Sequence, residues 1–405
     1  MDITEISGGI CAAKGFSANG ICCGIKKNST KADLALIYSQ KKAAAAAVYT
    51  TNLVYGAPIT VTRNNIADGY AQAVICNSGN ANTCNANGIK IAEQMCFLAA
   101  AELDIDAKDV IVASTGVIGC PLNIDPIASG MGKLAAGLGD HSDSASRAIM
   151  TTDLVPKEIA VSFMLSGKEC HLGGIAKGSG MIHPNMATML GFLTTDAAIS
   201  PKMLQSALQD DVKDTFNMIS VDGDTSTNDM VAIMANGMAE NPEIVSEGAD
   251  YAVFKQALNY VTKYLSRQIA GDGEGATKLL ECHVSKAKDK EAAVKISKSV
   301  ICSSLVKAAM FGEDANWGRV LCAIGYSGAD VDVHKVDLSF SSAAGNIQVC
   351  ANGSGIEFSE EKAAEILHEK EIQINITLGD GEAEACAWGC DLTYDYVKIN
   401  GDYRT

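Results

Sequence analysis

Hydrophobic and polar residues alternate along the chain in short blocks that predict a protein of mixed α and β structure. From Gly88 to Ala101 the apolar residues recur every three or four positions, which predicts a helix with one buried face. The same periodicity predicts a helix that follows Ser200-Pro201, where serine is the N-cap and proline the first helical residue. A third stripe predicts a long helix over residues 251–270.

Runs of β-branched and aromatic residues predict strands between these helices. In the glycine-rich region from 8 to 62, Leu34–Tyr38 and Ala46–Thr50 predict two separate strands joined by tight turns. A helix is expected over 141–153, and another that begins at Ser359 with two glutamates in its first turn. Further strands are predicted at 73–76, 110–113, 172–176, 189–193, 279–284, 331–340, 346–351, 371–378 and 384–392.

The stretch from Lys177 to Leu190 departs from both periodicities over its first ten residues, which is typical of a shaped turn. Gly178 and Gly180 permit backbone angles closed to other residues, and Pro184 restricts the approach to Thr188. A threonine hydroxyl is a weak nucleophile, but a free α-amine with a pKa near ~8 on the same residue can activate it. We therefore hypothesise that Thr188 cleaves its own preceding peptide bond. A glycine-rich turn that leads into a strand is the alternative from the local residues.

Length and charge narrow the class of protein. The 405 residues allow two domains or one large layered domain, and the formal net charge of −16 argues against nucleic acid or an anionic membrane as a partner. An anionic substrate would need a local cation. The first residues lack a basic segment followed by an apolar one, and no apolar run is long enough to span a bilayer, so a cytoplasmic protein is expected.

The fourteen cysteines lack the spacing of a metal site. Nine of them sit mainly in apolar runs, and we expect these to be small buried hydrophobic residues in a reducing compartment: Cys22, Cys23, Cys76, Cys84, Cys96, Cys282, Cys302, Cys322 and Cys350. Residues 220–229 superficially resemble a calcium loop. Counted from Asp222, however, Thr227 and Ile233 occupy the positions where such a loop needs glycine and glutamate. No metal site is predicted.

The fourteen residues from Lys177 to Leu190 resemble the cleavage and nucleophile motif of the ArgJ family, the glutamate N-acetyltransferases also called ornithine acetyltransferases. The resemblance extends from residues 12–16 to Thr405. It implies a layered αββα sandwich of the ArgJ and DmpA type that cleaves itself between Ala187 and Thr188. Chains 1–187 and 188–405 would remain together in an α2β2 assembly, the second beginning with the nucleophile.

The resemblance also implies an oxyanion hole at Thr115 and Gly116, which follow the strand predicted at 110–113. A hydroxyl beside a free backbone N–H can stabilise a developing negative charge. Without the resemblance, this pair is more often a turn that ends a strand.

Substrate binding is assigned by the same resemblance. Lys177 suits a substrate carboxylate, and Glu274, within a glycine-rich run, suits an ammonium group. Thr151 is preferred to its neighbour Thr152. From pattern alone, the last ten residues would be a strand with a frayed tail. The predicted substrate-binding residues are Thr151, Lys177, Thr188, Glu274, Asn400 and Thr405.

The implied reaction moves an acetyl group from N2-acetyl-L-ornithine to L-glutamate through an acetyl-threonine ester, a step in arginine biosynthesis. No cofactor is expected, and the motifs leave open whether acetyl-CoA is a second donor. A related N-terminal-nucleophile aminopeptidase or amidohydrolase, which passes the acyl group to water, is one alternative. A non-catalytic protein with acidic calcium sites is another.

Overall fold

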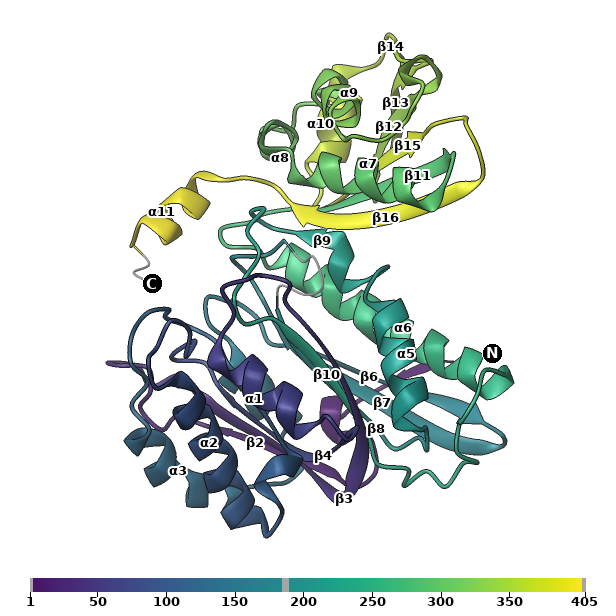
Figure 1. Ribbon diagram of the computed structural model, residues 1–405. Helices are drawn as coiled ribbons and strands as arrows, with labels where there is room; N and C mark the ends of the chain where they lie inside the picture. Colours follow the sequence, from purple (N-terminus) through teal and green to yellow (C-terminus); the bar gives the residue numbers. More distant parts are fainter. Residues whose placement is uncertain (1–2, 184–188, 403–405) are drawn as a thin grey trace.

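The computed structural model describes residues 3–183 and 189–402 and contains two β-sheets (Figure 1). The first has nine strands along the path β1-β6-β7-β8-β10-β3-β4-β5, with β2 paired to β3. The second has seven strands in the order β14-β13-β12-β15-β11-β16-β9. Since three predicted site residues, Ala187, Thr188 and Thr405, lie outside the described residues, their roles stay predictions.

The long strand β3 (Leu34–Tyr49) determines the shape of the first sheet. Its first half pairs with β2 and β4, its second half pairs with β10, and the register with β4 shifts between Tyr38 and Ala43. The prediction of two strands separated by a turn is therefore wrong. The polar segment 40–42 remains extended and exposed where the strand changes partners.

The change of partner along β3 divides the nine strands into two layers. An apolar cluster between the layers joins Ile37, Val74 and Ile111 on one side to Ile175 and Phe192 on the other. The first layer consists of β2 (Phe16–Ile21), the first half of β3, β4 (Tyr70–Asn77) and β5 (Val110–Ser114). The second consists of β1 (Thr4–Ile6), β6 (Lys157–Leu165), β7 (Lys168–Lys177), β8 (Leu190–Thr195), β10 (Met230–Ala235) and the second half of β3.

Helices cover the outer face of each layer. The apolar residues of α2 (Gly88–Leu103) and α3 (Asp125–Ala136) pack on the first layer, and α1 (Ala57–Asn65) packs against α2 and β5. The apolar residues of α5 (Pro201–Asp211) and α6 (Ala249–Gly271) pack on the second layer. The order helix, sheet, sheet, helix is the αββα sandwich that the resemblance implied, so the fold prediction is confirmed.

The second sheet lies beyond one end of the sandwich (Figure 1). Its core is continuous with that of α6, and α7 packs on β11 and β16. Its strands are β9 (Ile219–Ser220), β11 (Leu279–Ala287), β12 (Asp337–Ser342), β13 (Gly345–Ala351), β14 (Ser354–Gly355), β15 (Glu371–Thr377) and β16 (Ala383–Cys390). The α-helices between β11 and β15 are α7 (Lys290–Cys302), α8 (Ser304–Phe311), α9 (Trp317–Gly325) and α10 (Glu360–Leu367).

Several local predictions can be checked directly. The hydroxyls of Ser200 and Ser359 cap α5 and α10, as predicted. The helix expected over 141–153 is the shorter α4 (Ser142–Ile149), which fills one edge of the core between the layers. The pattern suggested a strand near the C-terminus, but residues 394–402 form a helix, α11 (Tyr394–Asp402), with no buried residue.

The predicted division into 1–187 and 188–405 falls between β7 and β8, which pair antiparallel within one layer. It is therefore not the boundary between the sandwich and the second sheet, and as a covalent boundary it stays a prediction.

Candidate active site

A polar pocket of about 100 Å³ lies where β5 and β7 end, and most of the predicted site residues meet there. Both Thr151 and Thr152 line it, so the structure does not choose between them. The predicted residues brought together are Thr115, Gly116, Thr151, Lys177, Glu274 and Asn400. Residues far apart in the sequence therefore converge on one pocket.

One side of the pocket is formed by Thr115 and Gly116, directly after β5. Gly116 has φ +118°, and a Cβ added there would lie 2.8 Å from the carbonyl carbon of Gly79 and 2.9 Å from the nitrogen of Asn80. Glycine is therefore required by both conformation and space. Within the described chain, the hydroxyl of Thr115 and the N–H of Gly116 have no hydrogen-bond partner. Both donors are available to a ligand.

Asn228 holds this side of the pocket, and sequence reasoning missed its role. Its Nδ2 donates to the carbonyl oxygens of Ala81, at 2.5 Å, and Ser114, at 2.9 Å. Its Oδ1 accepts hydrogen bonds from the hydroxyls of Thr83, at 2.5 Å, and Thr227, at 2.6 Å. The side chain is buried and all its bonds go to neutral groups. The only signal in the sequence was its place in the stretch 220–229, which could not reveal these partners.

Another part of the pocket wall is held by buried charges. The Nζ of Lys157, fully buried, lies 2.7 Å from Asp153 Oδ1 and 2.6 Å from Asp272 Oδ2. Asp153 also accepts the backbone N–H of Thr151 at 3.0 Å and of Gly178 at 2.7 Å. One lysine thus fixes two segments that carry predicted substrate contacts, 151–153 and 177–178. None of these three charged residues was predicted as part of the site.

Glu274 is attached to the same network through Ser179. The hydroxyl of Ser179 donates to the carbonyl oxygen of Asp272 at 2.7 Å, and its own carbonyl accepts the N–H of Glu274 at 3.0 Å. A Cβ at Gly180 would overlap the carboxyl group of Glu274, so glycine is needed for this approach. Asn400 in α11 donates to Glu274 Oε2 at 2.7 Å. The C-terminal helix therefore contributes to the pocket, and the substrate contact of Asn400 stays a prediction.

Lys177 is the cation of the pocket. It is only 9% exposed, and within the described residues its ammonium has no hydrogen-bond or ion-pair partner. A nearly buried ammonium without a direct partner is suited to bind an anionic group, because desolvation strengthens that attraction. This chemistry agrees with the carboxylate contact predicted from the sequence.

Two buried carboxylates near Lys177 have pKa values shifted in opposite directions. Burial raises the pKa of Asp153, but attraction to Lys157 and Lys177 and the hydrogen bonds it accepts outweigh burial and lower it. Burial raises the pKa of Asp229 well above its usual value, and Lys177 only partly opposes this. Among the described residues, Oδ2 of Asp229 has no hydrogen-bond partner. The carboxylate with two lysines is therefore held ionised, whereas that of Asp229 tends to stay protonated.

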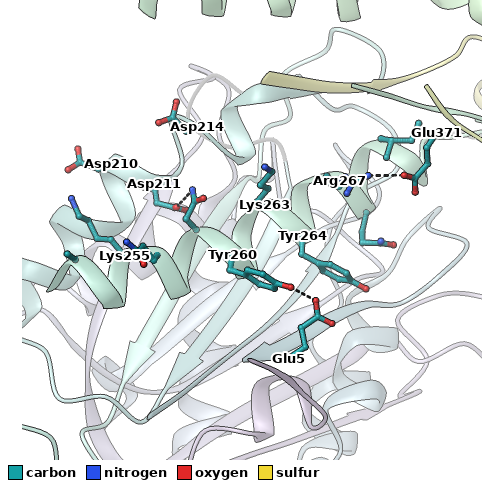
Figure 2. Close-up of a pocket in the computed structure, with 15 residues that line it drawn as sticks. Glu5, Asp210, Asp211, Asp214, Lys255, Tyr260, Lys263, Tyr264, Arg267 and Glu371 are labelled. Atoms are coloured by element: carbon teal, nitrogen blue, oxygen red, sulfur yellow. Dashed lines mark hydrogen bonds and ion pairs between the residues drawn. The ribbon is translucent and has the colours of Figure 1, made fainter. Parts of the chain in front are cut away.

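A much larger hollow, of about 880 Å³, lies elsewhere, along the exposed face of α6 (Figure 2). It contains none of the predicted site residues. Its acids are mostly paired: Glu5 accepts from Tyr260 at 2.6 Å, and Glu371 pairs with Arg267 at 3.0 Å. The volume of a pocket alone therefore does not identify the candidate active site of this protein.

The remaining predictions concern metals, cysteines and membranes. The described residues contain no cluster of histidine, cysteine and carboxylate groups arranged to hold a metal ion. All fourteen cysteines are free, but Cys22, Cys84 and Cys322 are exposed, so the expectation of burial is wrong for these three. They lie in turns or on outer helix faces, which short apolar runs did not reveal. In the described part of the chain, no helix has the length and apolar character needed to cross a bilayer.

The αββα layers and a small pocket that combines free donors with an unpaired lysine are suited to an enzyme that acts on small polar molecules. The ArgJ family model matches residues 17–405. An arginine biosynthesis bifunctional protein ArgJ from Caldanaerobacter subterraneus subsp. tengcongensis is 51% identical over 402 residues, 99% of both chains. Its counterpart from Bacillus cereus is 48% identical over 100% of this chain and 98% of its own. The chain belongs to the ArgJ family and is an acyltransferase of arginine biosynthesis.

Solved structures of relatives match parts of the chain. The ArgJ protein of Bacillus halodurans is 46% identical and covers 52% of this chain and 97% of its own, with a TM-score of 0.49. The ornithine acetyltransferase of Mycobacterium tuberculosis, solved with ornithine, is 34% identical and covers 46% of this chain and 100% of its own, with a TM-score of 0.42.

Proposed function

We propose that the enzyme transfers an acetyl group from N2-acetyl-L-ornithine to L-glutamate through an acetyl ester on Thr188, after cleaving itself between Ala187 and Thr188. The observation that carries this proposal is the convergence of Thr115, Gly116 and Lys177 on one pocket. Free oxyanion donors on one side and an unpaired ammonium on the other are what an acyl transfer between amino acids needs.

Strand pairing supports Thr188 as the nucleophile. Lys177, the last residue of β7, pairs with Leu190, the first residue of β8. The carbonyl oxygen of Met189 accepts the N–H of Met230 at 2.9 Å, and the adjacent Asp229 lines the pocket. Met189, which follows the proposed nucleophile in the sequence, is therefore attached to a strand beside this pocket.

The chemistry proceeds in two balanced steps. The free amine of Thr188 takes the hydroxyl proton while the oxygen attacks the acetyl carbon, and Thr115 and Gly116 donate to the oxyanion. The C–N bond to ornithine then breaks, and the leaving amine takes the proton. Glutamate attacks the ester in the reverse manner, releases N-acetylglutamate and restores the hydroxyl. Because the acetyl-enzyme exists after ornithine has left and before glutamate reacts, ping-pong kinetics are expected.

One pocket can accept both amino acids because both carry a carboxylate and, when not acetylated, an α-ammonium group. Lys177 would bind the carboxylate, and Glu274, held by Asn400, would accept from the ammonium group. Thr151 and the terminal Thr405 would complete the substrate contacts. No step requires a metal or a nucleotide.

We further propose that the two chains produced by cleavage remain paired and assemble as α2β2 in the cytoplasm. Their association is supported by β7 and β8, whose ladder from Leu172–Thr195 to Lys177–Leu190 would join the two chains after cleavage. Native mass spectrometry measures the assembly. Dissociated chains in an active preparation would contradict this part of the proposal.

The test compares Thr188→Ala with Thr188→Ser, which keeps the hydroxyl. The alanine variant should remain a single polypeptide and lose transfer, whereas the serine variant should retain part of both activities. Transfer at the wild-type rate by Thr188→Ala would overturn the proposal.

Measuring the acyl product separates transfer from hydrolysis. With acetylornithine and glutamate present, N-acetylglutamate should accumulate faster than free acetate. Acetate as the main product would instead assign the chain to the hydrolytic alternative.

A further inference from the structure

One stretch of the chain, residues 220–230, holds the polypeptide on both sides of the proposed cleavage site. Before that site, the carboxylate of Asp222 accepts the backbone N–H groups of residues 181 and 182 at 2.6 and 2.9 Å. After it, the N–H of Met230 donates to the carbonyl oxygen of Met189 at 2.9 Å. The stretch therefore contacts the chain both upstream and downstream of the bond that is proposed to break.

Thr225 extends the upstream contact to the last described residue before the site. Its hydroxyl donates to the carbonyl oxygen of His183 at 2.9 Å, and its backbone forms an antiparallel bridge with Ile182. Residues 184–187 are all that separates His183 from the proposed nucleophile. Since each residue spans at most ~3.6 Å of extended chain, a fixed His183 limits where the cleaved bond can lie.

The backbone at Met181 shows that this contact holds an unfavourable conformation. Met181 has φ +55°, in the left-handed region that residues with a side chain rarely adopt. Such a residue persists only where its surroundings hold it, and here its own N–H is bound by Asp222. The carboxylate of Asp222 is fixed in turn by the N–H of Asp224 at 3.2 Å and by the hydroxyl of Tyr396, in α11, at 3.3 Å. A well-anchored carboxylate thus shapes the turn just before the proposed cleavage site.

We propose that Asp222 and Thr225 are positioning residues for self-cleavage, and we call this pair the cleavage clamp. The clamp holds residues 181–183 in the arrangement from which the hydroxyl of Thr188 reaches the carbonyl carbon of Ala187. This inference rests on the proposed function. It assigns a role to the stretch 220–229 that the acetyl transfer itself does not use.

The clamp takes no part in bond making or breaking. In the cleavage, the hydroxyl of Thr188 adds to the carbonyl carbon of Ala187, and its proton passes to the nitrogen of Thr188 as the peptide bond breaks. Water then hydrolyses the ester, which leaves a carboxyl group on Ala187 and restores the hydroxyl. The clamp contributes through proximity, because a misplaced bond meets the hydroxyl less often. It should therefore affect cleavage more than the later transfer of acetyl groups.

The test follows cleavage of the full-length chain, made by cell-free translation, by intact-mass analysis at timed intervals. Asp222→Asn should slow cleavage about tenfold, because an amide offers one oxygen to the two N–H groups and turns its own NH₂ toward the second. The matched control is Asp224→Asn. Asp224 is an exposed residue of the same loop, and its carboxylate accepts no hydrogen bond within the described residues. The control should cleave within twofold of the wild-type rate.

A second substitution separates positioning from a general loss of stability. Glycine adopts positive φ without the cost that methionine carries, so adding Met181→Gly to Asp222→Asn should restore cleavage at least threefold. The control for this rescue is Lys286→Gly in the same background. Lys286 is exposed and has φ +53°, but it lies in β11 of the second sheet. It should restore no cleavage.

Thr225→Val tests the other half of the clamp. It keeps the shape of the side chain but removes the hydroxyl that donates to His183, so cleavage should slow about threefold. Once cleavage is complete, kcat for acetyl transfer per cleaved molecule should lie within threefold of wild type for Thr225→Val and for Asp222→Asn.

The outcomes separate the clamp from the proposed function. Cleavage of Asp222→Asn at the wild-type rate, or a rescue by Met181→Gly no better than that by Lys286→Gly, would overturn the clamp. A fall in kcat per cleaved molecule as large as the fall in cleavage rate would also overturn it. A wild-type chain that stays uncut and still produces N-acetylglutamate would instead refute the proposed function.

Discussion

The two sides of the active-site pocket are built from different kinds of interaction. The neutral wall, Thr115 and Gly116, is held by the amide of Asn228 through bonds to backbone carbonyls and hydroxyls. The charged wall, which carries Thr151, Lys177 and Glu274, is held by Lys157 between two buried carboxylates. Donors that must keep one geometry throughout the reaction are held by groups that do not titrate. The residues predicted to bind charged substrate groups are held by a buried lysine that pairs with two buried carboxylates.

This difference predicts unequal sensitivity to mutation. Replacing a neutral hydrogen-bonding group leaves a few polar atoms without partners, whereas replacing the central lysine leaves buried charges uncompensated. The charged wall should therefore lose more free energy of folding, and the neutral wall should lose more catalytic rate.

The largest effect is expected for Lys157→Met, which preserves volume but removes the charge between Asp153 and Asp272. Breaking a buried pair by removing one partner costs ~3–5 kcal/mol, and urea denaturation should show a loss of that size. The matched control is Lys213→Met, whose pair with Asp210 at 3.0 Å is exposed. Its cost should be under ~1 kcal/mol. Equal losses would show that the buried network does not hold the wall.

The next effect is expected for Gly116→Ala, because the added Cβ meets the backbone of residues 79 and 80 and displaces the oxyanion donor. Loss of one such donor lowers kcat by about 10²–10³-fold. Gly119→Ala is the control. Gly119 also has positive φ, +75°, but apart from its own neighbours in the chain no atom of the described residues lies within 4 Å of its Cβ position. Steady-state kinetics should show near-wild-type kcat for the control. A similar loss in both variants would assign the effect to backbone strain alone.

Asn228→Ala should have a smaller effect on stability than the change at Lys157. It leaves the carbonyl oxygens of Ala81 and Ser114 without their donor, at a cost of about 2 kcal/mol. Since the end of β5 loses its attachment, kcat should fall while KM for glutamate changes little. The exposed Asn346→Ala provides the control for stability. A rise in KM with unchanged kcat would contradict the role of the neutral wall.

The smallest effect concerns acidic pH. The pKa of Asp153 is lowered in the folded protein, so its contribution to stability is present above its unfolded pKa, near ~3.9, and is lost as pH falls below that value. Hydrogen exchange should show that segments 151–155 and 177–180 lose protection as the pH falls below about 4. The end of β5, held by Asn228, should lose less. Equal losses in both walls would remove the distinction between them.

Much of the fold follows from local patterns. The apolar stripes of α2, α5 and α6 and the caps at Ser200 and Ser359 were predictable because each depends on neighbours within one or two turns. The continuity of β3 was not, since its polar middle reads as a turn. It remains extended because β4 and β10 continue its hydrogen bonding on either side of the change of partner.

The active-site residues also include some that the sequence could predict and some that it could not. Thr115, Gly116, Lys177 and Glu274 stand in short motifs that a resemblance can locate. The residues that hold them were not predicted, because Lys157 and Asp272 are 115 positions apart, and Asn228 and Ser114 are 114 apart. A buried lysine within a strand also gives no local signal that distinguishes it from a surface lysine.

The central claim is that Thr188 becomes a new N-terminus and carries the acetyl group. Intact-mass analysis of the enzyme mixed with acetylornithine, without glutamate, tests both parts at once. The account predicts two polypeptides, residues 1–187 and 188–405, with the mass of one acetyl group added to the second and lost again when glutamate is supplied. A single unbroken polypeptide in a preparation that produces N-acetylglutamate at the full rate would contradict it.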